Sequence, residues 1–144
     1  MKTHLTFETF RANLSAKIKN LGSSRLVVAY SGGLDSSVLL DLVVSFVREY
    51  KSISVSLIHV DHGLSPSSLE WGAHCKEIAS LYNLECSVVR VATLRKVNQS
   101  EEAWARTARY GILERYVDAN STLLTAHHKN DQVETIIHHA MSGA

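Results

Sequence analysis

Short apolar segments typical of buried strands alternate along this chain with amphipathic segments typical of helices. The strand-like segments are RLVVAY (25–30), SISVSLIHV (52–60), ECSVVRV (85–91) and STLLTA (121–126). Helical spacing of apolar residues predicts helices over 5–20, 36–49, 69–82 and 98–119, and again from about Asn130. Because strands separated by helices imply parallel pairing, the expected fold class is α/β, a Rossmann-like parallel sheet with helices on both faces.

Composition sets the broad class of the protein. At 144 residues the chain corresponds to about one domain with a real core. A net charge of +1 excludes a strong global attraction to nucleic acid or to acidic membranes. No apolar run is long enough to cross a bilayer, and the first residues lack the apolar core of a signal peptide. The two cysteines, Cys75 and Cys86, are not in a CxxC motif, so we expect free thiols in a reducing cytoplasm.

Polar residues concentrate just after three of the predicted strands. The segments are SGGLDSS (31–37), HVDHGL (59–64) and TAHHKND (125–131). In a parallel sheet, ligands bind beyond the carboxyl ends of the strands, at the point where the strand order reverses. We therefore expect these segments to build the functional site.

The segment SGGLDSS has the composition of an anion-binding loop. Gly32 and Gly33 let the backbone turn tightly and approach a ligand closely, because they lack a Cβ atom. The loop amides and the start of the next helix would cradle a phosphate, and Ser31 and Ser36 add hydroxyl groups. Asp35 would repel that phosphate unless Mg²⁺ lies between them. The alternative is structural: a first-turn carboxylate favoured by the helix dipole, after a simple glycine turn.

The longest helical segment carries two arginines near its apolar side. On a helical wheel of residues 103–117, Arg109 falls inside the apolar arc and Arg106 lies at its flank. A guanidinium on the buried side should have an anionic partner, either a structural carboxylate or a bound phosphate. A side chain that snorkels to solvent is the other alternative. The wheel alone favours a structural role and does not say which arginine would contact a ligand.

The segment TAHHKNDQVET places further polar groups after the fourth predicted strand. Asp131 and Glu134 would share one face of the predicted helix, because they are three residues apart. First-turn carboxylates also favour the helix dipole, with Asn130 as the cap, so a structural role stays open. Zinc is a weaker hypothesis for the eight histidines, since HVDH and HHKND lack a well-spaced set of three or four ligands.

Four motifs together resemble a known family. SGGLDS matches the SGGxDS signature of the PP-loop ATP pyrophosphatases, with their adenine nucleotide alpha hydrolase-like fold. HVDHGL (59–64), ARTARY (105–110) and TAHHKNDQVET (125–135) follow in the order of the tRNA(Ile)-lysidine synthetase family, and the resemblance runs from about Arg25 to Gly143. It implies that ATP and Mg²⁺ adenylate the C2 carbonyl of the wobble cytidine in a tRNA(Ile) with a CAU anticodon. The lysine ε-amine then displaces AMP and gives lysidine.

The resemblance also implies roles for individual residues. ATP would bind Ser31, Gly32, Gly33, Leu34, Asp35, Ser36 and His59. The catalytic residues would be Asp35, Arg106, Arg109, His127, Asp131 and Glu134. Of these, Asp35, Asp131 and Glu134 would hold Mg²⁺. The commoner family form HHxDDxxET has an aspartate where this chain has Asn130, and an amide cannot act as a base, so position 130 has no expected catalytic role.

The sequence leaves two other functions open and also predicts the domain organisation. A PP-loop tRNA thiolase would need a sulfur-carrying cysteine, usually paired, whereas the two cysteines here lie in a predicted helix and a predicted strand. A non-catalytic nucleotide-binding module would need the glycine loop but not the other charged motifs. Members of the family are longer, so residues 1–144 are expected to be an N-terminal PP-loop catalytic domain without the later tRNA-binding domains. A membrane partner is not expected, and a homodimer is compatible with the sequence.

Overall fold

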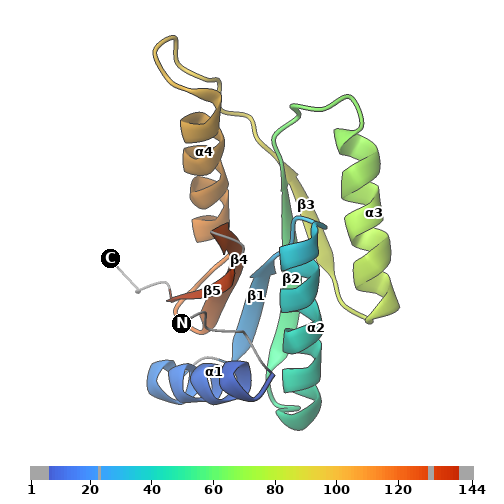
Figure 1. Cartoon of the computed structure of the whole chain (residues 1–144), viewed down its shortest axis with the longest axis vertical. Coiled ribbons are helices and arrows are strands. Elements are labelled where there is room, and N and C mark those ends of the chain that lie inside the picture. The colour runs from blue at the N-terminus through green and yellow to red at the C-terminus, as the bar shows by residue number, and fades with distance from the viewer. Residues whose placement is uncertain (1–6, 23, 130–131, 140–144) are drawn as a thin grey trace.

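The computed structural model describes residues 7–22, 24–129 and 132–139, which form alternating helices and strands (Figure 1). The elements are α1 (Phe7–Leu21), β1 (Arg25–Ala29), α2 (Leu34–Glu49), β2 (Ser54–Asp61), α3 (Ser68–Leu81), β3 (Cys86–Arg90), α4 (Glu101–Arg115), β4 (Ser121–Lys129) and β5 (Gln132–His139). None of the described helices is both long and apolar enough to cross a membrane. As far as β4, the element order is the predicted one.

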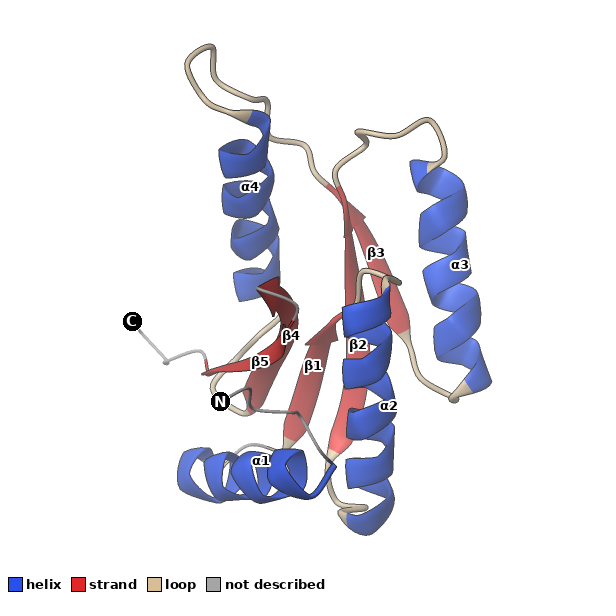
Figure 2. Cartoon of the chain, in the orientation of Figure 1, coloured by secondary structure: helices blue, strands red, loops and turns tan. Residues whose placement is uncertain are grey.

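The strands form one sheet in the order β3-β2-β1-β4-β5 (Figure 2). β1 pairs in parallel with β2 and with β4, and β2 pairs in parallel with β3. The chain first moves outward from β1 to β3 and then returns to the other side of β1. The predicted parallel arrangement is therefore confirmed for four strands, and the strand order reverses between β1 and β4.

The predicted helix from about Asn130 is wrong. Residues Gln132–His139 form β5, which runs antiparallel to β4 and makes the sheet mixed rather than fully parallel. Val133, Thr135 and the adjacent Ile136 and Ile137 are β-branched, so an extended backbone suits them better than a helix. β5 also pairs with the outer side of β4. Without β5, the backbone N–H and C=O groups on that side of β4 would have no strand to pair with.

Helices cover both faces of the sheet, as predicted. On one face, α1, α2 and α3 pack against β1 and β2, with Leu14, Leu39 and Phe46 fully buried. On the other face, Ile112 and Leu113 of α4 pack against β1, β2 and β4. Burial on both faces explains why β1 continues after Arg25 as an uninterrupted apolar run, LVVA, rather than an alternating one.

This topology brings several distant loops together at the carboxyl ends of the parallel strands. β1, β2 and β3 run in the same direction, so the loops that follow them lie at the same end of the sheet (Figure 2). The β1–α2 loop covers residues 30–33, the β2–α3 loop 62–67 and the β3–α4 loop 91–100. α4 is shorter than predicted. It begins after Ser100, whose side chain caps the first turn, and it ends at Arg115.

Candidate functional site

Two serine hydroxyls hold the β1–α2 loop. Ser36 Oγ accepts hydrogen bonds from the backbone N–H groups of Ser31 and Gly32, both at 3.1 Å. Ser31 Oγ accepts one from the N–H of Gly33 at 3.2 Å and lies 2.9 Å from Ser36 Oγ. Ser36 is buried, so it fixes the loop from inside. The amides of residues 31–33 were expected to cradle a phosphate, but they donate to serine oxygens instead. The N–H groups in the first turn of α2 are therefore the better hydrogen-bond donors for an anion.

The N-terminus of α2 lies at the edge of the sheet just after this loop. Its N-cap residue is Gly33, which has no side chain with which to cap the helix. The first-turn N–H groups of a helix have no acceptor within it, and the helix dipole adds partial positive charge at that end. Leu34 is 81% exposed and Asp35 is half-buried in this turn. The arrangement suits an anion bound at the start of α2.

Gly32 is required by both its backbone conformation and its surroundings. Its φ is +81°, in the region that L side chains rarely adopt. A Cβ atom at this position would lie 2.9 Å from Cζ2 of Trp71 and 3.1 Å from Sγ of Cys75. The glycine was predicted to allow a close ligand, and the structure adds the close approach of a tryptophan from α3.

Trp71 contacts the β1–α2 loop, and sequence reasoning did not single it out. Its indole Nε1–H donates a hydrogen bond to the carbonyl oxygen of Ser31 at 2.6 Å. A single aromatic residue in an amphipathic helical pattern resembles a core residue, so nothing in the sequence marked it. Its position seven residues after the HVDHGL motif was the one feature that could have drawn attention to it.

His59 links β2 to the end of β1. Its Nδ1 lies 2.9 Å from the carbonyl oxygen of Tyr30, and because a carbonyl only accepts, Nδ1 carries the proton. The side chain is buried at 7% exposure. In its neutral form this leaves Nε2 as a hydrogen-bond acceptor. The structure therefore places His59 beside the β1–α2 loop, as predicted.

A cavity of about 250 Å³ opens where β1 and β2 end, and Arg109 of α4 lines it together with Ser31, His59 and His62. Burial lowers the pKa of the Arg109 guanidinium, an effect that Tyr110 opposes and Arg106 reinforces. An arginine stays charged at neutral pH even so. The described residues form two ion pairs, Arg11–Glu49 and Arg95–Glu101, neither of which involves Arg109. A partly buried cation in this position suits an anionic ligand.

The two arginines of ARTARY have different positions. Arg106 is exposed, and its guanidinium lies 5.7 Å from the centre of the Tyr110 ring. Arg109 lies 5.8 Å from the same ring and also reaches the cavity. Of the two arginines, Arg109 therefore lines the cavity at the carboxyl ends of β1 and β2 and Arg106 does not, a distinction that the helical wheel left open.

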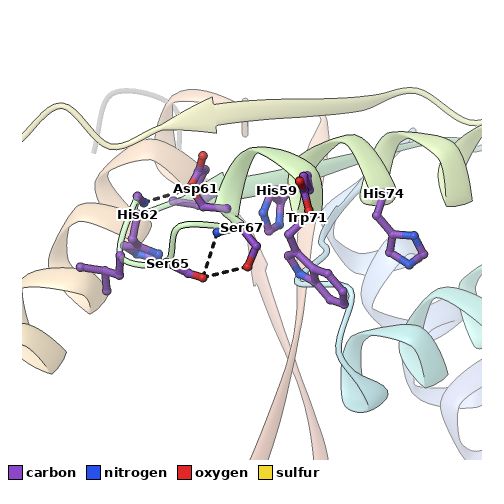
Figure 3. A pocket seen from close by; sticks show the side chains of 12 residues that line it. His59, Asp61, His62, Ser65, Ser67, Trp71 and His74 are labelled. Carbon is purple, nitrogen blue, oxygen red and sulfur yellow. Dashed lines mark hydrogen bonds between the residues drawn. The ribbon is translucent and has the colours of Figure 1, made fainter.

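A second cavity, of about 590 Å³, lies between the β2–α3 loop and the start of α3 (Figure 3). His62 Nε2 donates to the carbonyl oxygen of Ala105 in α4 at 2.9 Å, which ties this loop to the helix that carries Arg109. Asp61 is buried, and its Oδ1 accepts a hydrogen bond from the N–H of Gly63 at 2.8 Å, so it shapes the turn. Among the described residues, no group of three His, Cys, Asp or Glu side chains could hold a metal ion.

Two of the remaining predicted site residues, His127 and Glu134, lie on β4 and β5. His127 is inside β4 rather than after it, and its backbone pairs with that of Glu134 on β5. The β1–β4 register ends at Val28↔Leu124, and by the same offset His127 is level with Ser31. Glu134 therefore lies on a strand, and the predicted helix face that it would share with Asp131 is not formed. Asp131 and the side chains of His127 and Glu134 lie outside the described part of the chain.

Both cysteines of the chain are free and shielded. Burial raises the pKa of the Cys75 thiol to about 11, and the nearby Cys86 adds to the shift. Burial also raises the pKa of Cys86, against smaller opposing effects of Lys76 and a backbone hydrogen bond. Because the thiolate is the reactive form, neither cysteine has the environment of a nucleophilic thiol.

Replacing Gly32 by alanine should destabilise the protein, because the methyl group meets Trp71 and Cys75 and the backbone conformation is unfavourable for alanine. We expect the free energy of unfolding to fall by about 1–3 kcal/mol in urea titrations. Gly111→Ala on α4 is the matched control, since no atom lies within 4 Å of its added Cβ. That control should raise stability by up to about 1 kcal/mol. Equal effects of the two substitutions would contradict the constraint on Gly32.

Comparison with known proteins gives the family. The family model of the PP-loop domain matches residues 6–144. The tRNA(Ile)-lysidine synthase of Methylococcus capsulatus is 40% identical over 140 residues, an alignment that covers 97% of this chain and 30% of that protein. The chain spans between 25 and 30% of the length of this and two other curated lysidine synthases that it matches.

Solved structures agree on the fold. The U34-tRNA thiolase NcsA from Methanococcus maripaludis, with its [4Fe-4S] cluster, is similar with a TM-score of 0.56 and 21% identity, over 76% of this chain and 41% of that chain. The NH3-dependent NAD synthetase from Campylobacter jejuni, in complex with the nitrate ion, has a TM-score of 0.62 and 21% identity, over 81% and 53%. These likenesses concern the fold alone. By the match along its whole described length, the chain belongs to the PP-loop domain family.

Proposed function

We propose that this chain is the ATP-binding catalytic domain of a tRNA(Ile)-lysidine synthetase, acting in the cytoplasm. The observation that carries the proposal is the convergence of Ser31, from the β1–α2 loop, and Arg109 on one cavity at the carboxyl ends of β1 and β2. Use of ATP follows from membership in the PP-loop family. The choice of reaction is supported by the identity to lysidine synthases over nearly the whole chain.

The phosphates of ATP would bind at the N-terminus of α2. The first-turn amides and the helix dipole attract them, and Ser31, at the exposed side of the loop, adds a hydroxyl group. Asp35 stands in the same turn, where its carboxylate fits one ligand position of a Mg²⁺ ion. When bound, Mg²⁺ would neutralise phosphate charge; one carboxylate is enough, since this ion usually takes its other ligands from phosphates and water.

The nucleoside would occupy the space beside His59. This side chain lines both cavities, and its Nε2 can accept a hydrogen bond in the neutral form. The larger cavity, about 590 Å³, falls within the range of small-molecule sites. His59 would thus orient the nucleotide, while its Nδ1–H holds the end of β1 in place.

Two displacements make up the reaction. The C2 carbonyl oxygen of the wobble cytidine attacks the α-phosphorus of ATP, and the bond to pyrophosphate breaks. The lysine ε-amine then attacks C2, the C–O bond to AMP breaks, and the amine loses its proton. Arg109 is suited to the charge that develops on the phosphate and the carbonyl oxygen, because a preorganised cation at a partly buried site needs little reorganisation. His127, Asp131 and Glu134 stay candidates for contacts to phosphate, metal or the amine.

The alternatives account less well for the described site. A thiolase of the same fold would need a reactive cysteine, whereas Cys75 is buried beneath Gly32 and its pKa is raised to about 11. A nucleotide-sensing module would not need a partly buried arginine that lines the cavity beside the β1–α2 loop. The lysidine reaction needs no thiol, and it would use the partly buried arginine.

Lysine substitution should separate the two arginines. Arg109→Lys should lower tRNA-dependent AMP formation by about 100-fold, because an ammonium group cannot reproduce the planar fork of a guanidinium. Arg106→Lys is the matched control and should stay within about threefold of the wild type, because Arg106 is exposed. Similar activity of both variants would contradict the role of Arg109.

The thiol environment gives a test against the sulfur-transfer alternative. With a pKa of about 11, Cys75 should react with iodoacetamide at pH 8 at least ~100-fold more slowly in the folded protein than in urea, where its pKa is about 8.5. Mass spectrometry of each cysteine-containing peptide gives the rates. Rapid alkylation of Cys75 in the folded state would restore the thiolase hypothesis.

Product analysis tests the proposed function itself. The protein is incubated with ATP, Mg²⁺, labelled lysine and bulk tRNA, and the products are expected to be AMP, pyrophosphate and lysine linked to a tRNA cytidine. Asp35→Ala should abolish AMP transfer while circular dichroism stays native, and Asp35→Asn should be nearly as damaged, since a lost preorganised charge contact costs about 3 kcal/mol. Release of ADP, or sulfur in the tRNA in place of lysine, would refute the proposal.

A further inference from the structure

We propose that Trp71 is a positioning residue for ATP binding, because it holds the Ser31–Gly32 peptide in one orientation. This inference rests on the proposed function, in which ATP binds beside the same loop. Trp71 belongs to α3 and lies 40 residues after Ser31, whose carbonyl oxygen it contacts. Its role is distinct from that of the residues that would touch the phosphates.

The Ser31–Gly32 peptide group is bonded at both of its polar atoms. The carbonyl oxygen of Ser31 accepts the indole N–H of Trp71 at 2.6 Å, and the N–H of Gly32 donates to Ser36 Oγ at 3.1 Å. Rotation of this peptide would break both hydrogen bonds and exchange the positions of its carbonyl and amide. A carbonyl oxygen turned toward the start of α2 would repel an anion there.

Glycine itself does not fix this orientation. Gly32 adopts positive and negative φ with similar ease, so its φ of +81° must be selected by its surroundings. The indole favours this conformation, because its N–H holds the carbonyl of Ser31 and its Cζ2 and Cε2 atoms lie 2.9 and 3.1 Å from the place where a Cβ of Gly32 would be. Hydrogen bond and ring contact thus act on the same two residues.

Trp71 is not explained by core packing. The buried residues of α3 are Gly72, Cys75 and Ala79, which form the stripe that faces the sheet. Trp71 lies outside this stripe and is 44% exposed. Its ring is tilted by 31° against His74 at 5.1 Å and lines the larger cavity together with His59 (Figure 3). One side chain therefore contacts both the loop and the proposed nucleotide cavity.

Trp71→Phe tests this role, since it keeps an aromatic ring but removes the N–H group. We expect the dissociation constant for Mg²⁺–ATP, measured by calorimetry, to rise about tenfold, which is the usual value of one lost hydrogen bond. The matched control is Trp104→Phe, which removes the indole N–H that donates to the carbonyl oxygen of Thr93 at 2.8 Å, outside the β1–α2 loop. The Trp104 ring lies 5.9 Å from that of His62, an edge contact that a phenylalanine ring can keep. That variant should bind Mg²⁺–ATP within about twofold of the wild type.

Fluorescence supplies a readout that a purely structural role would not change. The chain has two tryptophans, so in Trp104→Phe the emission comes from Trp71 alone. Saturating Mg²⁺–ATP should change that emission with the calorimetric dissociation constant, and Trp71→Phe should show no such change. Wild-type affinity in Trp71→Phe, or an unresponsive Trp71, would overturn the inference while the proposed function stands. A wild-type protein that fails to bind Mg²⁺–ATP would instead refute the proposed function.

Discussion

The peptide between Ser31 and Gly32 is the constraint on which the rest of the site depends. Ser36 holds its amide and Trp71 holds its carbonyl, and only glycine fits at φ +81° beneath the indole. This turn follows the end of β1 at Ala29 and allows α2 to begin at Leu34, so that the helix N-terminus lies at the carboxyl end of β1. The anion site that we propose at the start of α2 therefore depends on the turn that follows β1.

Strand order supplies the other half of the site. Because β1 lies between β2 and β4, its carboxyl end is the place where segments far apart in the sequence meet. His59 arrives from β2 and Arg109 from α4, and the backbone of His127 arrives along β4. Solved proteins with this fold include a tRNA thiolase and an NAD synthetase, so the fold alone does not choose the reaction. In this chain Arg109 lines the cavity and neither cysteine has the environment of a nucleophilic thiol, which is why we propose the lysidine reaction rather than sulfur transfer.

Much of this arrangement could be predicted from the sequence because it depends on local patterns. The four parallel strands are apolar runs, and the SGGLDSS loop is marked by its glycines and serines. Gln132–His139 was mispredicted because its spaced apolar residues also fit a helix, and pairing with the edge of β4 decided for a strand. Trp71 and the difference between Arg106 and Arg109 depend on how α3 and α4 are placed against the sheet, which no local pattern contains.

Hydrogen exchange of the amides in residues 31–37, with and without Mg²⁺–ATP, tests the central claim most directly. The amides of Ser31 and Gly32 already donate to Ser36, so their exchange should be slow in both states. The first-turn amides of α2 have no acceptor within the helix, so they should become protected when nucleotide binds. Protection confined to other regions, with the start of α2 unchanged at saturating nucleotide, would contradict a phosphate site built on this loop.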